Sequence, residues 1–471
     1  MIELHANSGF GRALTDCLLL YLDFDLDNAT EASPEVSAVA RRLLGLATTD
    51  DAWVGTALTP DEFYDLARTS FERFLRDDAS GWKAKQLIAS VSTFFHEARH
   101  VHDLLSTAFG ISVLNRSYNC YQNAVGITLE LEAWQNGQPG RQIPLPVMST
   151  LPAVGLSEES AKILRRAAEL PALIAKEGQP EGGLFNWMNS THLLEASATL
   201  VQLDIINDLF GPEGVSSFTD LLSESEANRT YLRLINDITE IVDMRKNAQQ
   251  RAGSILSFLL WVSLQGVGSK QSEGLVGKPS AVAYFHAVAE YVTRKCRGDI
   301  SLSLVRDLVD GFNAHWGFAS LADTLAATHA RQARHSQKLS DAWNGVNQAG
   351  ANVYPPLFRA LTAAHQNLIA KIESDLDNYF IGYRYGIAVL TGGLPAVRVD
   401  YKTGGRIWRK FSSGIPCLPE KDWGELEEWA GILRLLACGR CKNPLHHIEE
   451  RAYNYCRGEA KLKFVDVSGL F

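Results

Sequence analysis

Five consecutive residues, His96-Glu97-Ala98-Arg99-His100, carry the pattern HExxH. On an α-helix, positions i and i+4 lie on one face, one turn apart. Two imidazoles at this spacing can bind one Zn²⁺ ion in a tetrahedral site. Glu97 follows the first histidine, so its carboxylate can reach a water on the metal and accept a proton from it. The pattern therefore predicts a zinc site in which Glu97 acts as general base.

The surrounding sequence predicts that the motif lies on a helix with one polar side. A polar row recurs at helical spacing, formed by Ser92, His96, His100, Asp103 and Thr107. An apolar row lies roughly opposite, formed by Phe94, Ala98, Val101, Leu105 and Phe109. Gly110 then offers a stop, after which we expect an irregular segment. We expect the helix to pack on the core with one side and to show its histidines to a polar cleft with the other.

The segment 91–110 resembles the active-site helix of zincin metallopeptidases. In that family the HExxH motif supplies two zinc ligands and the catalytic glutamate, which here are His96, His100 and Glu97. The resemblance implies a zincin-like helical catalytic core that hydrolyses a peptide bond. It covers this helix and, less directly, one downstream helix.

A second polar row begins near Ser190 and offers the third protein ligand that a two-histidine zinc site needs. At helical spacing, one side of this segment carries a set of polar residues: His192, Glu195, Thr199 and Gln202. We expect Glu195 to complete the metal site. The segment resembles the helix that carries a glutamate ligand in gluzincins, one branch of the zincins. Thr199 departs from that branch, because thermolysin-like members have a carboxylate there that orients a ligand.

Other residues remain alternatives for parts of this site. Asp103 and His192 are alternatives for the third ligand. Asp103 could also orient a ligand imidazole from its own helix, or form an ion pair with Arg99 one turn earlier. A hydrolytic site further needs a donor for the oxyanion. The candidates are His192, Tyr118 and Tyr121, of which we expect His192 to act.

The C-terminal region contains a second pattern that suits zinc. Cys438 and Cys441 have CxxC spacing, and His446, His447 or Cys456 could complete a structural site. The alternative is that these cysteines are free thiols. We therefore expect one catalytic zinc ion, with a second, structural ion near Cys438, Cys441 and Cys456 as an open alternative.

Composition and charge restrict the classes of function. The chain has 471 residues, of which 46% are hydrophobic and 21% are charged, as is ordinary for a globular protein. A net charge of −9 argues against a nucleic-acid partner, because that needs a basic surface. The sequence predicts no membrane-spanning segment and no secretory signal. Seven cysteines, an odd number, suggest reduced thiols and a cytoplasmic location.

The order of the predicted elements indicates a mainly α fold. It comprises a zincin-like helical catalytic core, extra helical subdomains and a small α+β C-terminal region, in which 396–411 predicts a hairpin. The predicted divisions are an N-terminal region (1–80), the catalytic core with both polar rows (81–265), a helical region (280–395), and a C-terminal hairpin with the Cys/His residues (396–471).

The sequence thus predicts a zinc metallopeptidase with a protein or peptide substrate, whose activity a partner could control. Two alternatives stay open. Glu97 and His100 also form ExxH, the helical unit of carboxylate-bridged di-iron proteins, although the sequence lacks a second such unit. The other alternative is a helical interaction protein in which the HExxH motif is degenerate and does no chemistry.

Overall fold

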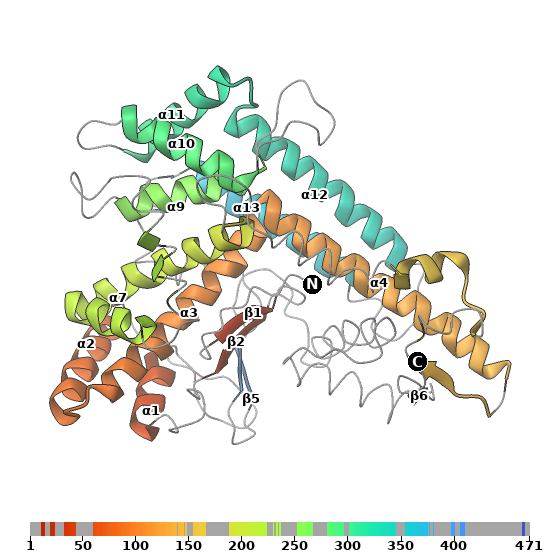
Figure 1. Ribbon diagram of the computed structural model, residues 1–471, viewed down its shortest axis with the longest axis horizontal. Helices are drawn as coiled ribbons and strands as arrows, with labels where there is room; N and C mark the ends of the chain where they lie inside the picture. Colours follow the sequence, from red (N-terminus) through yellow and green to blue (C-terminus); the bar gives the residue numbers. More distant parts are fainter. Residues whose placement is uncertain are drawn as a thin grey trace.

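A computed structural model gives the fold of the chain (Figure 1). The part that the structure describes is mainly helical, which agrees with the predicted fold class at this coarse level. The described residues are 11–14, 19–23, 33–43, 60–138, 140–145, 147, 154–165, 188–223, 229, 232–233, 235–236, 252–266, 280–295, 301–344, 354–374, 376, 380, 397–400, 406–409 and 464–466.

Helix α3 (Trp82–Ser106) lies at the centre of the molecule. From Gln86 onward, every side chain of α3 that the structure describes is buried. A helix covered all round needs neighbours on every side. These neighbours are α1 (Pro34–Leu43), α2 (Pro60–Asp77), α4 (Ala108–Asn136), α7 (Ser190–Ser223), α13 (Tyr354–Ser374), β1 (Gly11–Leu14) and β2 (Leu19–Asp23). The expectation that α3 shows its histidines to an open polar cleft is therefore wrong, because α7 covers its polar row.

Helix α7 runs beside α3 and supplies the second polar row (Figure 1). In its first part, every residue from Leu193 to Gln202 is buried. Gly211 interrupts it with φ 69° and ψ −170°, a conformation that only glycine adopts without strain, and Pro212 starts the next helical turn. The kink thus separates the segment that carries the second polar row from the rest of α7.

The apolar core surrounds these two helices. Phe71 of α2 packs on Phe210 of α7 with ring centroids 5.3 Å apart. On the other side, Phe258 and Trp261 of α9 (Ala252–Ser263) pack against Phe380. The polar rows of α3 and α7 therefore meet inside the core, where a polar side chain needs a partner.

The chain turns sharply at Thr107, between α3 and α4 (Ala108–Asn136). Thr107 has an extended backbone, with φ −113° and ψ 150°, and its Oγ1 accepts a hydrogen bond from the Gly110 amide at 3.0 Å. A threonine in this position is a favourable N-cap. The sequence prediction of a helix stop at Gly110 followed by an irregular segment is therefore wrong, because the Thr107 cap starts a new helix three residues earlier.

Gly110 is needed for close packing at this turn. A Cβ atom at residue 110 would lie 2.3 Å from the Leu104 Cα and 2.6 Å from the Asp103 carbonyl oxygen. Both are backbone atoms that cannot move aside. The first turn of α4 thus rests directly on the last turn of α3.

Replacing Gly110 by alanine is expected to lower the free energy of unfolding by about 3 kcal/mol, because the methyl group overpacks against the α3 backbone. The matched control is Gly126→Ala in the same helix, where a Cβ would meet nothing within 4 Å. That control is expected to gain about 0.5–1 kcal/mol from helix propensity. Urea unfolding of both variants tests the contact, and equal stabilities would contradict it.

Side chains from distant elements bind the carbonyl end of α3. Gln265 Nε2 donates to the Ser106 carbonyl at 3.0 Å, and Trp261 Nε1 donates to Ser106 Oγ at 3.1 Å. His365 of α13 places Nδ1 2.7 Å from the Leu105 carbonyl oxygen. The bonds to the Ser106 and Leu105 carbonyls satisfy groups that a helix end leaves without partners. They fix where α3 ends and therefore where its histidines lie.

The described parts of the predicted helical region 280–395 are helical apart from a short turn. Helix α10 (Ala281–Lys295) contacts α9, and α12 (Leu321–Asn344) lies along α4 and α13 (Figure 1). Helix α11 (Leu302–His315) contacts α9 and α10. None of the helices in the described part of the chain combines the length and apolar character needed to cross a membrane. The predicted domain boundaries stay predictions.

The described strands form two small sheets. The first has the order β1-β2-β4-β5, with β2 and β4 parallel and the outer pairs antiparallel: β1 (Gly11–Leu14), β2 (Leu19–Asp23), β4 (Val397–Asp400) and β5 (Arg406–Arg409). β4 and β5 fall within the segment that predicts a hairpin. The second sheet pairs β3 (Ile143–Leu145) with β6 (Phe464–Asp466) in parallel.

The rest of the predicted α+β C-terminal region lies outside the described residues. This applies to Cys438, Cys441 and Cys456, and to His446 and His447. The second zinc site therefore stays a prediction.

Candidate metal centre

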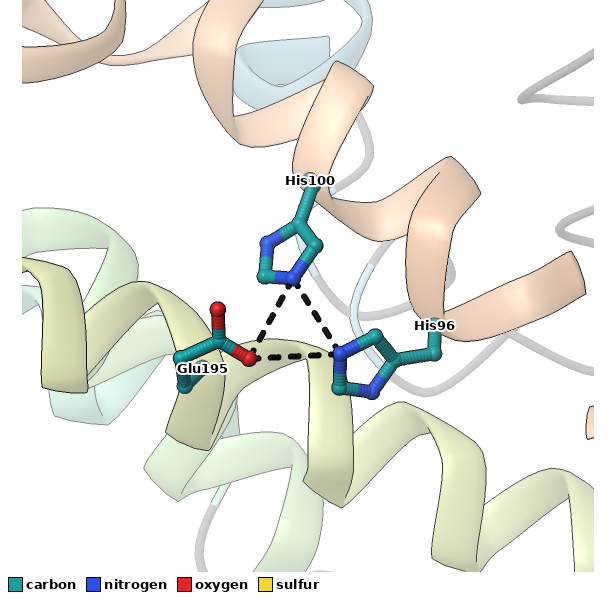
Figure 2. Close-up of side chains that lie close together, drawn as sticks. All are labelled: His96, His100 and Glu195. Atoms are coloured by element: carbon teal, nitrogen blue, oxygen red, sulfur yellow. Dashed lines mark hydrogen bonds and ion pairs between the residues drawn. The ribbon is translucent and has the colours of Figure 1, made fainter. Parts of the chain in front are cut away.

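Three ligand atoms meet in the interface between α3 and α7 (Figure 2). The Glu195 Oε2 atom lies 3.3 Å from His96 Nε2 and 3.4 Å from His100 Nε2. The two Nε2 atoms lie 3.1 Å apart. In the described part of the chain, this is the one group of three or more histidine, cysteine or acidic residues that could hold a metal ion. The structure thus brings together the three ligands expected from the sequence.

The triangle of ligand atoms has the dimensions of a zinc site. In a tetrahedral site with bonds of about 2.0–2.1 Å, neighbouring ligand atoms lie about 3.3–3.4 Å apart. The three measured distances, 3.1, 3.3 and 3.4 Å, fall within a few tenths of an ångström of that value. The imidazole rings stand edge to face, at 86° to one another, and both Nε2 atoms face the Glu195 carboxylate (Figure 2). The three side chains are therefore placed so that they could hold a metal ion.

The charges at this site also favour a cation. His96, His100 and Glu195 are 5%, 0% and 6% exposed. Burial alone would raise the pKa of Glu195, but the His100 and His96 imidazoles outweigh it and hold that pKa below its usual range. Apart from these imidazoles, neither carboxylate oxygen of Glu195 has a hydrogen-bond partner among the described residues. A buried anion of this kind is stable only beside a positive charge.

Glu97 lies directly after the first ligand on α3 and is 1% exposed. His96 and His100 on the same helix are buried as well. A carboxylate is costly to bury, so Glu97 needs a polar or charged partner inside the core.

Asp103 does not belong to the ligand group. Its Oδ2 accepts a hydrogen bond from Arg99 Nε at 2.9 Å, and its Oδ1 lies 3.1 Å from His102 Nδ1. Burial would raise the pKa of Asp103, but the Arg99 guanidinium and the His102 imidazole together outweigh this and lower it. Burial lowers the pKa of His102. Of the alternatives for Asp103, the structure therefore shows the ion pair with Arg99, within a wholly buried cluster.

Asp103→Asn is expected to lower the free energy of unfolding by about 3–5 kcal/mol, because it removes the negative charge that faces the buried Arg99 guanidinium. Asp341→Asn is the matched control, since Asp341 is exposed near the end of α12. That change is expected to alter the stability by less than about 0.5 kcal/mol. Urea unfolding measures both, and a loss at Asp103 no larger than the control's would contradict the account of this cluster.

His192 takes part in the start of α7 and is absent from the ligand group. Asn189 Oδ1 accepts a hydrogen bond from the His192 amide at 3.1 Å, and His192 Nδ1 accepts one from the Asn189 amide at 3.1 Å. This is a capping box in which an imidazole replaces the usual glutamate. Burial lowers the pKa of His192, against an opposite effect of Glu195. The ring is therefore neutral near pH 7 and carries its proton on Nε2.

The other oxyanion candidates, Tyr118 and Tyr121, lie on α4. Their side chains are outside the part of the structure that is described. A role for either tyrosine stays a prediction.

Two residues at the site were given no role from the sequence. Gln202 Oε1 lies 3.1 Å from His96 Nδ1, and Gln202 Nε2 donates to Ser92 Oγ at 2.9 Å. Both residues belong to the predicted polar rows, since Ser92 lies one turn before His96 and Gln202 two turns after Glu195. The signal that could have found them is this shared spacing with the ligands.

Comparison with protein-family models, curated proteins and solved structures finds no match to this chain.

Proposed function

We propose that this chain is a zinc-dependent hydrolase, most specifically a metallopeptidase, that binds its ion through His96, His100 and Glu195. The observation that carries the proposal is the buried triangle of two imidazole nitrogens and one carboxylate oxygen, with a buried glutamate next to it in the chain. A zincin-like core and a protein or peptide substrate belong to the same proposal.

The number of ligands supports a catalytic site over a structural one. Structural zinc sites are usually closed by four protein ligands, whereas catalytic sites have three and leave a position for water or substrate. Three ligand residues gather in the described part of the chain. The same composition, two histidines and one carboxylate, favours a mononuclear site over a di-iron centre, which needs further carboxylates.

The proposed reaction divides the chemistry between the ion and the chain. A zinc ion in such a site polarises a carbonyl group and lowers the pKa of water to near 7. Glu97 accepts a proton from the attacking water and passes it to the leaving amine. Zinc fits better than magnesium or calcium, because imidazole ligands suit transition metals and those ions prefer oxygen.

His192 is the proposed donor to the oxyanion. Its Nδ1 accepts a hydrogen bond from the Asn189 amide, so in the neutral ring Nε2 carries the proton and is the donor. It lies one turn before Glu195 on α7 and is only partly buried. A neutral imidazole can donate a hydrogen bond to a developing negative charge.

His192→Ala is expected to lower kcat about 10²-fold, the typical effect of losing one oxyanion donor. Asn189→Ala is the matched control, because it removes the cap of α7 but retains the imidazole. The control is expected to lower the stability by about 1 kcal/mol with a small effect on kcat. Equal losses of kcat in the two variants would assign His192 a structural role alone.

The burial of the ligands supports control of the activity by a partner. A polypeptide needs direct access to the metal position, yet the three ligands are at most 6% exposed and Glu97 is 1% exposed. Elements that cover the α3–α7 interface must therefore move before a substrate binds. We propose that binding of a protein partner or of the substrate itself opens the site.

Terminal labelling of a proteome tests the proposed activity. The proteome is incubated with zinc-loaded wild type or with zinc-loaded Glu97→Gln, and new protein N-termini are identified. We expect new termini only with the wild type. New termini with both proteins would show that Glu97 does no chemistry, and their absence with both would contradict peptidase activity toward that proteome.

A further inference from the structure

Gln202 connects the two helices that hold the proposed ion. It lies on α7 and is 7% exposed, and Ser92 on α3 is 0% exposed. The carboxamide bridges Ser92 Oγ, at 2.9 Å from its nitrogen, and His96 Nδ1, at 3.1 Å from its oxygen. Helix α3 thus supplies both the anchor and the ligand, and α7 supplies the bridge.

The bridge fixes which nitrogen of His96 carries the proton. A carboxamide has a donor side and an acceptor side. Because the NH₂ group donates to Ser92 Oγ, the oxygen faces His96 Nδ1, and that nitrogen must be the donor. The Nε2 atom then keeps its lone pair, which points toward His100 and Glu195. This is the form of imidazole that binds a metal ion.

We propose that Gln202, held by Ser92, is a positioning residue that keeps His96 in its metal-binding tautomer. The inference rests on the proposed metal site, though it needs no catalytic activity. The same bridge sets the charge around the ion, because an amide is neutral where many metal sites place a carboxylate behind a ligand histidine. A carboxylate at residue 202 would make His96 a stronger ligand.

Three substitutions separate this role from simple packing. Gln202→Leu keeps the approximate volume and removes the acceptor, so we expect zinc to bind about 10–100-fold more weakly. Gln202→Glu keeps an acceptor for Nδ1–H, and the Ser92 hydroxyl can turn to donate to it. We expect that variant to bind zinc at least as tightly as the wild type. Ser92→Ala frees the amide to flip, so we expect a smaller loss than with Gln202→Leu.

The experiment is a zinc titration of the full-length apo proteins in competition with a chromogenic chelator. Thermal unfolding of each apo protein shows that it is folded, and ¹⁵N-histidine NMR reports the tautomer of His96. We expect Nδ1–H in the wild type and a mixture of tautomers in Gln202→Leu. Unchanged zinc affinity in Gln202→Leu, or equal losses in Gln202→Leu and Gln202→Glu, would overturn the inference. If the wild type itself binds no zinc, the proposed metal site fails as well, so the two failures are distinguishable.

Discussion

Replacing Glu97 by glutamine is expected to lower kcat by about 10²–10⁴-fold and to leave zinc bound. The change keeps the shape of the side chain but removes the base that accepts a proton from water. Glu97 is outside the ligand group, so its substitution leaves all three proposed metal ligands in place. Metal analysis of the purified variant and turnover of a substrate found by terminal labelling measure the two effects separately.

The matched control for this variant is Glu290→Gln, which changes an exposed carboxylate that pairs with Arg294 on α10. It is expected to retain full activity. If Glu97→Gln turned over substrate as fast as this control, the proposed general base would be wrong even if the metal site were correct. If Glu97→Gln lost its zinc, the loss of activity would say nothing about proton transfer, and Glu97 would have to be placed among the residues that hold the ion.

Glu195→Ala is expected to remove zinc from the protein. Its carboxylate is the one anionic ligand in the group, and only the two imidazoles remain without it. The loss of affinity should exceed the 10–100-fold that is typical for a residue behind a ligand. Competition titration with a chelator measures it. His315→Ala, which changes an exposed histidine at the end of α11, is expected to bind zinc like the wild type.

The unfolding temperature provides an independent test of metal binding in Glu195→Ala. An ion that binds only the folded protein stabilises it by about 4 kcal/mol when its free concentration is 1,000 times Kd. A chelator should therefore lower the unfolding temperature of the wild type and leave that of Glu195→Ala unchanged. A wild type that responds to the chelator no more than Glu195→Ala does would contradict a metal between α3 and α7.

The HExxH motif and helical spacing predicted the two histidine ligands, and a second polar row placed Glu195 first among the candidates for the third ligand. His96 and His100 are neighbours on one helix, so their geometry is local and follows from the 3.6-residue period. Glu195 is distant in sequence, but it lies in a second polar row on a helix that is otherwise buried. Two such rows inside one core have to face each other, because each satisfies the polar groups of the other.

The other features of the fold and the site depend on tertiary contacts, which the spacing of residues in the sequence does not reveal. The turn at Thr107 exists because α4 folds back onto the last turn of α3, which the absence of a Cβ at Gly110 allows. The cleft expected beside His100 is filled by α7. The second hydrogen bond of His96 goes to Gln202, from a helix more than a hundred residues later. Sequence periodicity shows that these residues share a side, but not what they touch.

His192 shows that even a contact between residues three positions apart was not predicted from the sequence. Its place in the polar row suggested metal binding or catalysis. The capping box with Asn189 shows that its Nδ1 is already used at the start of α7. Sequence reasoning missed this because glutamate or glutamine usually fills that position in a capping box.

Anomalous diffraction at the zinc edge, from crystals of the wild type grown with one equivalent of zinc, tests the central proposal most directly. We predict one strong peak between α3 and α7, at about 2.0–2.2 Å from His96 Nε2, His100 Nε2 and a Glu195 carboxylate oxygen. A crystal in which these three side chains converge as described and no peak lies between them would contradict the account.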